Sequence, residues 1–211
     1  AAAWCAILCR ALQHAHEAGI VHRDLKPANI MIDMDEQLHI MDFGLAKQNS
    51  HDVTTAIERY QRARYMLRQE RDGTTSRGGP LLGTPAYMPP EQARGDGYLA
   101  DHRADIYSLG VILYELLTKR RPFLGKPSNV LRQIRVSQPK PPRWLNRRVP
   151  KALQDICLKA IAKVPESRYQ SADEFADDLE HFRNRQPITA SHRTFLGLAT
   201  RLLANRLSAP F

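Results

Sequence analysis

Residues 22–44 read HRDLKPANIMIDMDEQLHIMDFG and combine a polar loop with two short apolar runs. The runs at 30–32 and 37–41 are rich in strand-forming residues, and residues 33–36 between them favour a turn. We predict a β-hairpin in which residues 30–32 pair antiparallel with residues 39–41. Such a hairpin brings the residues before its first strand next to those after its second strand.

Several polar residues lie at or near the open end of this hairpin. Asn29 and Asp42 offer an amide oxygen and a carboxylate side by side, a hard oxygen pair that suits Mg²⁺. Asp24, upstream in the same loop, could orient an attacking hydroxyl group or accept its proton. Lys26 is near enough in sequence to neutralise charge on a transferring phosphoryl group. Metal, positioning base and counter-charge are the needs of phosphoryl transfer.

Apolar residues on both sides of the hairpin predict a mostly helical domain. Before the hairpin they recur with helical spacing at Trp4, Ile7, Leu8, Ala11, Leu12 and Ala15. This spacing predicts an amphipathic helix that ends at Gly19. Residues 106–117 carry apolar side chains on all sides, which indicates a helix buried at the centre of the domain. Two further amphipathic helices are predicted at 151–163 and 171–183.

Residues 22–29 match the catalytic loop HRD-x4-N of protein kinases, and residues 42–44 match the DFG motif one hairpin later. Over residues 1–185 the sequence resembles the C-terminal lobe of a bacterial eukaryotic-type (Hanks-type) serine/threonine protein kinase. The resemblance implies a mainly α, protein-kinase-like fold, with a helical C-terminal lobe and a small β-hairpin at the catalytic loop. It leaves residues 186–211 as a basic C-terminal tail or linker.

Later motifs follow in the family's order. Residues 83–91, GTPAYMPPE, resemble the end of a kinase activation segment, with Pro89 where the family usually has alanine. The resemblance implies that Glu91 forms a buried ion pair with Arg168. It also implies that Asp105, at the start of the central helix, braces the backbone of the catalytic loop.

The resemblance assigns roles to the polar residues of the hairpin end. Asp24 is expected to be the positioning base, Lys26 the charge stabiliser that also contacts ATP, and Asn29 and Asp42 the ligands of Mg²⁺ or Mn²⁺. Thr84 is expected to lie in the substrate loop. Lys26 and Thr84 together favour serine and threonine hydroxyls of a protein substrate over tyrosine. The expected reaction therefore transfers the γ-phosphate of ATP to protein Ser/Thr hydroxyls.

Two further residues of the loop have supporting roles in the family. His22 is expected to be a packed structural residue, and Arg23 to pair with a phosphate on the activation segment. That segment, residues 42–91, contains a basic insertion near 55–72, which is either a solvated surface element or a docking or regulatory element. The candidate phosphorylation sites are Thr54, Thr55, Thr74, Thr75 and Ser76.

Composition limits the other classes of function. The chain has 211 residues, 43% hydrophobic and 25% charged, with a net charge of +9, which is typical of a soluble globular protein. Basic charge admits nucleic acid or anionic membranes as partners, but no aromatic-basic motif supports nucleic-acid binding. Three cysteines without a CxxC pair favour buried thiols in a reducing compartment over disulfides or zinc.

The sequence lacks the motifs of the part of a kinase that precedes the C-terminal lobe. The chain contains no GxGxxG motif and begins with Ala1 rather than Met, so we expect a piece of a longer protein that supplies only the floor of the ATP site. This chain alone is then expected to turn over little or nothing. The alternative is a non-catalytic, kinase-like regulatory or scaffold module. We expect a cytoplasmic kinase domain, with membrane contact only through an anchor outside this chain.

Overall fold

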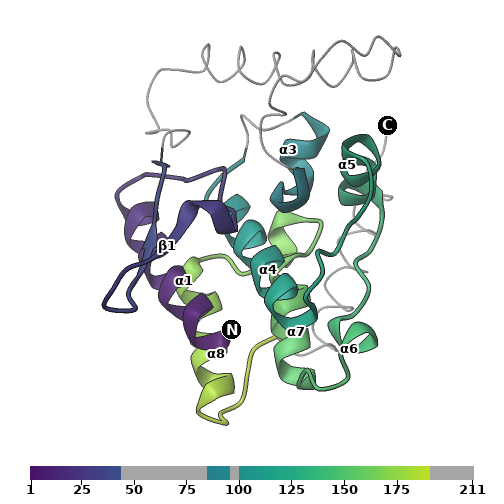
Figure 1. Ribbon diagram of the computed structural model, residues 1–211. Helices are drawn as coiled ribbons and strands as arrows, with labels where there is room; N and C mark the ends of the chain where they lie inside the picture. Colours follow the sequence, from purple (N-terminus) through teal and green to yellow (C-terminus); the bar gives the residue numbers. More distant parts are fainter. Residues whose placement is uncertain (44–84, 96–99, 191–211) are drawn as a thin grey trace, which may run out of the picture.

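The computed structural model describes residues 1–43, 85–95 and 100–190 of the chain (Figure 1). The predicted basic insertion, Gly44, the substrate-loop residue Thr84 and the five candidate phosphorylation sites lie outside the described residues. Most of the predicted C-terminal tail lies outside them as well.

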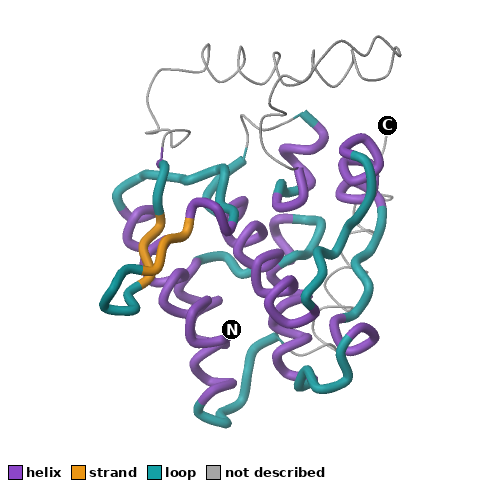
Figure 2. The backbone as a smooth tube through the Cα atoms, in the orientation of Figure 1, coloured by secondary structure: helices purple, strands orange, loops and turns teal. Residues whose placement is uncertain are grey.

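The described chain is mainly α-helical and contains one two-stranded antiparallel sheet (Figure 2). In chain order, its helices and strands are α1 (Ala2–Glu17), β1 (Ile30–Ile32), β2 (Leu38–Ile40), α3 (Pro90–Arg94), α4 (Arg103–Thr118), α5 (Pro127–Val136), α6 (Pro142–Leu145), α7 (Lys151–Ala160) and α8 (Ala172–Arg183). Short 3₁₀ turns lie at Pro27–Asn29, Pro85–Tyr87 and Pro165–Ser167. The predicted architecture, a helical lobe with a small β-hairpin, is confirmed.

Helix α4 runs through the centre of the domain, in contact with α1, α7 and α8 (Figure 1). Its residues from Ala104 to Tyr114 are all buried, because apolar side chains project from every side of the helix. At Gly110 an added Cβ would lie only 2.7 Å from the Cβ of Ala160. A glycine is therefore required where α4 packs against the end of α7.

Helix α1 buries only part of the stripe that its sequence pattern predicts, namely Leu8 and Leu12. Trp4 and Ile7 are 49% and 51% exposed, whereas the stripe through Cys5, Cys9 and Leu12 is buried, and α1 packs against α8 and α4. Small cysteine and alanine side chains on this stripe allow close packing of the helices. The buried face of α1 is therefore rotated from the predicted stripe toward Cys5 and Cys9, and it shares Leu8 and Leu12 with that stripe.

The three cysteines are buried free thiols. Burial raises the pKa of Cys5 to about 12 and also raises the pKa of Cys9 and of Cys157, so these thiols stay protonated at neutral pH. Within the described ranges, no group of three or more His, Cys, Asp or Glu side chains is arranged to hold a metal ion. The cysteines of α1 are core residues, as the sequence favours.

The β-hairpin forms in a register one residue away from the prediction. Ile30 pairs with Ile40, so the second strand is β2 rather than residues 39–41. The turn sets this register, because the Asp33 carboxylate accepts the N–H of Gln37 at 2.8 Å. The N–H of Asp33 also donates to the carbonyl of Gln37 at 3.0 Å, which closes the turn and starts the second strand directly after it.

Helices α3, α5 and α6 are missed by the sequence analysis. Each begins at a proline, a position where the missing N–H breaks no helical hydrogen bond. Phe123, Val130 and Ile134 form a small second core, against which Ala93 packs. Only two residues of α5, Val130 and Ile134, are buried, so the apolar stripe of this helix is short and was not recognised in the sequence.

The chain after α8 folds back onto the core. Asp178 in α8 is 1% exposed and accepts the N–H groups of Thr189 at 2.7 Å and Ala190 at 2.9 Å. Its carboxylate also accepts the hydroxyl of Tyr169 at 2.8 Å. Ala190 is part of the main hydrophobic core. The packed region therefore extends through residue 190, past the point where the resemblance ends.

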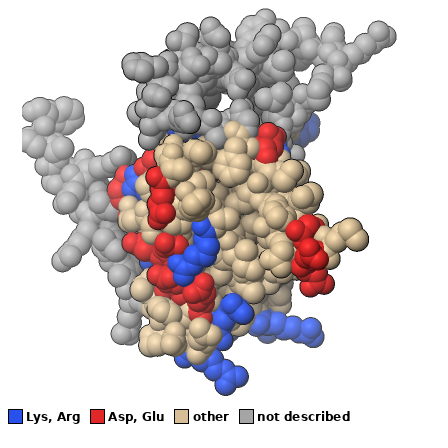
Figure 3. All heavy atoms as spheres, turned by 90° about the vertical axis from the view of Figure 1, so that its left-hand side faces the viewer, with Lys and Arg blue, Asp and Glu red and all other residues tan. Residues whose placement is uncertain are grey.

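Charged side chains join α1 to α8 at the surface. The Arg10 guanidinium lies within 2.6, 2.7 and 3.1 Å of carboxylate oxygens of Asp173, Asp177 and Glu180. Figure 3 shows the side of the domain that lies on the left in Figure 1. Acidic side chains form several groups there, with a few basic side chains among them. The side chains of Arg10 and its three acidic partners are 41–54% exposed. Each of these ion pairs therefore contributes little to stability.

Candidate active site

A buried carboxylate in α4 holds the backbone of the catalytic loop. Asp105 is 0% exposed, and its two oxygens accept the N–H of His22 at 2.9 Å and of Arg23 at 2.8 Å. His16 Nε2 lies 2.8 Å from the same carboxylate. The brace by Asp105 is expected from the sequence, whereas His16 lies at the end of α1 without a local motif that would predict this contact.

Two residues of the candidate site have left-handed backbone conformations. The φ angle is 66° at Arg23 and 60° at Asp42, a region that costs a non-glycine residue roughly 1–3 kcal/mol. At Arg23 the hydrogen bond from its N–H to Asp105 holds this conformation. Glu36, Lys119 and Arg185 adopt the same conformation outside the site, so this conformation does not by itself mark the site.

His22 connects the catalytic loop to the chain after β2. Its ring is fully buried, its Nδ1 accepts the N–H of Asp24 at 3.2 Å, and its Nε2 donates to the carbonyl of Met41 at 2.9 Å. The ring also packs on Phe43, with 4.8 Å between ring centroids. Both ring nitrogens are therefore engaged in holding the backbone, which fits a structural role rather than proton transfer.

Asp24, Lys26 and Asn29 meet in one small cluster. Lys26 Nζ lies 2.6 Å from an Asp24 carboxylate oxygen, and Asn29 Nδ2 donates to the Asp24 backbone carbonyl at 2.9 Å. The Asp24 and Lys26 side chains are 35% and 26% exposed, so both can be reached from solvent. Asn29 is buried, at 6% exposure, and its hydrogen bond fixes the backbone of Asp24.

The hairpin register brings Asn29 and Asp42 to the same end. The N–H of Met41 donates to the Asn29 carbonyl at 2.8 Å, which extends the pairing of the strands, and Asp42 follows directly. Because the Asn29 Nδ2 atom is committed to Asp24, its amide oxygen is the atom left to bind a cation. An amide oxygen and a carboxylate fit Mg²⁺ or Mn²⁺.

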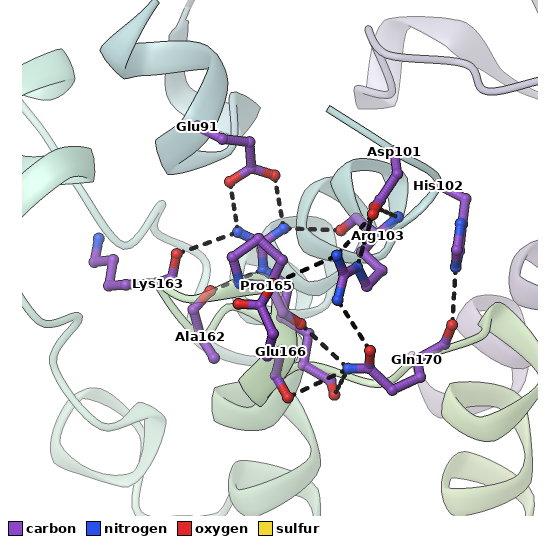
Figure 4. Close-up of polar contacts among 10 residues, drawn as sticks. Glu91, Asp101, His102, Arg103, Ala162, Lys163, Pro165, Glu166 and Gln170 are labelled. Atoms are coloured by element: carbon purple, nitrogen blue, oxygen red, sulfur yellow. Dashed lines mark hydrogen bonds and ion pairs between the residues drawn. The ribbon is translucent and has the colours of Figure 1, made fainter. Parts of the chain in front are cut away.

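A buried ion pair fixes helix α3, which follows the predicted substrate loop. Arg168 contacts both carboxylate oxygens of Glu91, at 2.8 and 2.7 Å, and the side chains are 0% and 13% exposed. Figure 4 shows the polar contacts around this pair. Arg168 also donates to the carbonyls of Ala162 at 2.9 Å and Arg103 at 3.0 Å, so the guanidinium joins α3 to the start of α4.

Further contacts join residues 85–95 to the catalytic loop and α4. Gln92 Nε2 donates to the Arg23 carbonyl at 3.2 Å, and Ser108 Oγ donates to the Tyr87 carbonyl at 2.9 Å. The Tyr87 hydroxyl donates to Glu115 at 2.6 Å. Burial and this carboxylate raise the pKa of Tyr87, which keeps its hydroxyl protonated. These contacts hold residues 85–95 beside residues 22–29, and none of them is visible in the sequence.

Replacement of Asp105 by asparagine tests the brace. Asp105→Asn removes one acceptor oxygen and the negative charge that bind three N–H donors, so we expect the free energy of unfolding to fall by about 3 kcal/mol. Urea denaturation of the 211-residue chain measures this change.

The control is Asp155→Asn in α7. Asp155 is also buried, but among the described residues its Oδ1 has no hydrogen-bond partner and its Oδ2 faces only the exposed Lys151. We expect a loss below about 1 kcal/mol. Equal losses in the two variants would contradict a special role of Asp105.

Comparisons with known proteins show which family the chain resembles. A family model described as a protein kinase domain matches residues 1–179. The chain is 39% identical over 183 residues to the serine/threonine-protein kinase PknB of Mycobacterium leprae, covering 86% of this chain and 26% of the relative. It is 38% identical over 212 residues to a probable serine/threonine-protein kinase of Corynebacterium efficiens, covering 96% and 29%. The chain spans about a quarter of the length of the curated relatives it matches.

Proposed function

The chain belongs to the protein kinase domain family, and we propose that it is the C-terminal lobe of a bacterial Hanks-type serine/threonine protein kinase. The observation that supports this most is the cluster of Asp24, Lys26 and Asn29, which the hairpin register joins to Asp42. The proposed reaction converts ATP and a protein hydroxyl group into ADP and a phosphoprotein. Relatives named serine/threonine-protein kinases support the choice of hydroxyl.

Each residue of the cluster has a distinct part in the proposed mechanism. Asp24 orients the substrate hydroxyl so that its oxygen faces the γ-phosphorus, and accepts the proton as the bond to phosphorus forms. Lys26, 2.6 Å from Asp24, offsets negative charge on the transferring group. Asn29 and Asp42 would hold Mg²⁺, which would neutralise negative charge on the phosphates of ATP.

An apolar surface beside the metal ligands suits the base of ATP. Met31 and Met41 are 46% and 44% exposed. The register places them on the same face of the hairpin as Asn29 and opposite to Ile30 and Ile40, which pack against the core. We infer that the base lies on the two methionine side chains, since nucleotide sites combine apolar walls with a few polar groups.

Activity requires more chain than the 211 residues contain. The sequence has no Gly-rich phosphate loop, so we propose that this chain alone does not turn over and that the complete product of its gene does. Phosphate on one of the predicted sites Thr54, Thr55, Thr74, Thr75 or Ser76 is proposed to pair with Arg23. Arg23 Nε is buried and has no hydrogen-bond partner among the described residues, which supports this pairing.

Substitution of Asp42 tests the metal site. In the complete gene product, Asp42→Asn should raise the Mg²⁺ concentration for half-maximal activity by about tenfold or more, because a carboxylate ligand is lost. Raising Mg²⁺ should then restore part of the activity. Steady-state rates measured over a Mg²⁺ titration check this expectation.

The control for the Mg²⁺ titration is Asp35→Asn in the hairpin turn. Asp35 is exposed and lies outside the site, so the Mg²⁺ requirement should stay unchanged. A normal Mg²⁺ requirement in Asp42→Asn would contradict the assignment of Asp42. Full activity without divalent cations would contradict the proposed function. Absence of phosphate transfer by the unaltered protein as well as by the variants would favour the non-catalytic scaffold module instead.

A further inference from the structure

Residues 119–151 form a surface segment of a single charge sign, called here the basic segment. It contains eleven Lys or Arg residues and no Asp or Glu. It spans the loop after α4, helix α5, helix α6 and the start of α7. All of its basic residues except the half-buried Arg121 are exposed.

The charges of the basic segment are not neutralised by the described part of the domain. Of its basic side chains, Lys151 is the one that lies within ion-pair distance of a described carboxylate, at 2.6 Å from Asp155. By contrast, the acidic side chains of α8 are grouped around Arg10. Figure 1 places α5 and α6 on the opposite side of the domain from α1 and the hairpin. The described domain is therefore electrically asymmetric.

Large apolar side chains are exposed within the same segment. Trp144 in α6 is 77% exposed, and Val136 at the end of α5 is 72% exposed. Arg143, Arg147 and Arg148, all exposed, flank Trp144 in the sequence. An exposed tryptophan among arginines is typical of surfaces that enter the interface between water and lipid.

We propose that the basic segment binds the surface of an anionic lipid bilayer, with Trp144 inserted at the level of the headgroups. A segment whose charged residues are all basic matches the negative charge of such a bilayer, whereas protein surfaces usually mix both signs. A nucleic-acid backbone would also attract the charges, but it offers little to Trp144 and Val136. Net charge alone admits an anionic membrane as a partner without saying which residues would meet it, whereas the basic segment and Trp144 give the contact a place on the domain.

The size of the segment supports an extended partner. Helix α5 has ten residues and is about 15 Å long, and the chain continues past it to α6 on the same side of the domain (Figure 1). A partner that meets both helices at once must be broad. Among the described residues no helix has the length and hydropathy to cross a bilayer, so the contact proposed here is with the membrane surface.

Fluorescence of a single tryptophan gives the most direct test. The chain has two tryptophans, so Trp4→Phe leaves Trp144 as the only one. With vesicles of equal parts phosphatidylglycerol and phosphatidylcholine, we expect the Trp144 emission to shift to shorter wavelength and to be quenched by brominated lipid. High salt should reverse the shift, and vesicles of pure phosphatidylcholine should not produce it. An unshifted emission with anionic vesicles overturns the proposal.

Matched charge variants separate this surface from general basicity. Arg147→Gln with Arg148→Gln should lower the partition coefficient on anionic vesicles by about tenfold or more, because each basic residue near the surface contributes. Arg183→Gln with Arg185→Gln removes two exposed charges outside the basic segment and should change partition much less. Equal losses overturn the proposal, as does binding to duplex DNA that anionic vesicles do not compete away. Neither measurement uses ATP, so its result is independent of the proposed kinase activity.

Discussion

Asp24→Asn in the complete gene product should lower kcat for phosphoryl transfer by roughly 10²–10⁴-fold, the range of positioned acid–base groups. Asparagine keeps the size of the side chain but cannot accept the proton of the substrate hydroxyl. It also lacks the charge that holds Lys26 at 2.6 Å. Steady-state kinetics with a peptide substrate measure the loss, and raised Mg²⁺ should not restore the rate.

The fold should survive this change. Asp24 is 35% exposed and its one described ion pair is with the partly exposed Lys26, so we expect the free energy of unfolding to change by less than about 1 kcal/mol. Thermal unfolding of the two proteins side by side checks this. A variant that keeps most of the activity would remove Asp24 from the mechanism, and one that unfolds would show that the lost rate reports on stability instead.

Arg168→Ala should cost about 3–5 kcal/mol of folding free energy, the typical penalty for removing one member of a buried ion pair. The change leaves the Glu91 carboxylate, which is 13% exposed, without its partner. It also leaves the carbonyls of Ala162 and Arg103 without the guanidinium donors. Urea denaturation of the 211-residue chain measures the loss.

Arg10→Ala is the control for Arg168→Ala. Arg10 faces three carboxylates, where Arg168 faces one, but its side chain is 41% exposed. Water replaces the lost contacts there, so we expect a loss of about 1 kcal/mol or less. A larger loss in Arg10→Ala than in Arg168→Ala would show that the number of ion pairs matters more than their burial, contrary to this interpretation.

Local patterns predict the parts of the fold that local chemistry determines. The hairpin and the catalytic loop follow from turn-forming and strand-forming residues within one short stretch. The central helix α4 is apolar on every side, so its burial is visible without knowledge of its neighbours. The register of the hairpin is wrong by one residue, because the hydrogen bonds between Asp33 and Gln37 cannot be distinguished from other turn geometries in the sequence.

Features that depend on distant segments are harder to predict. The inward face of α1 is set by close packing against α8 and α4, and the small side chains that permit this packing give a weak apolar signal. His16 contacts Asp105, which lies 89 positions away in the sequence, and Gln92 donates to the Arg23 carbonyl, 69 positions away. The resemblance identifies Asp105, Glu91 and Arg168, which periodicity and composition alone would have left as ordinary charged residues.

Phosphorylation of a peptide mixture that contains Ser, Thr and Tyr acceptors tests the central claim most directly. The complete gene product is incubated with the mixture and Mg²⁺–ATP, and mass spectrometry then assigns the modified residues, with the Asp24→Asn variant in parallel. We predict phosphate on serine and threonine, none on tyrosine, and a signal at least about 10²-fold lower with Asp24→Asn. Transfer to tyrosine, no transfer by the unaltered protein, or equal transfer by both proteins would contradict a serine/threonine kinase that uses this loop.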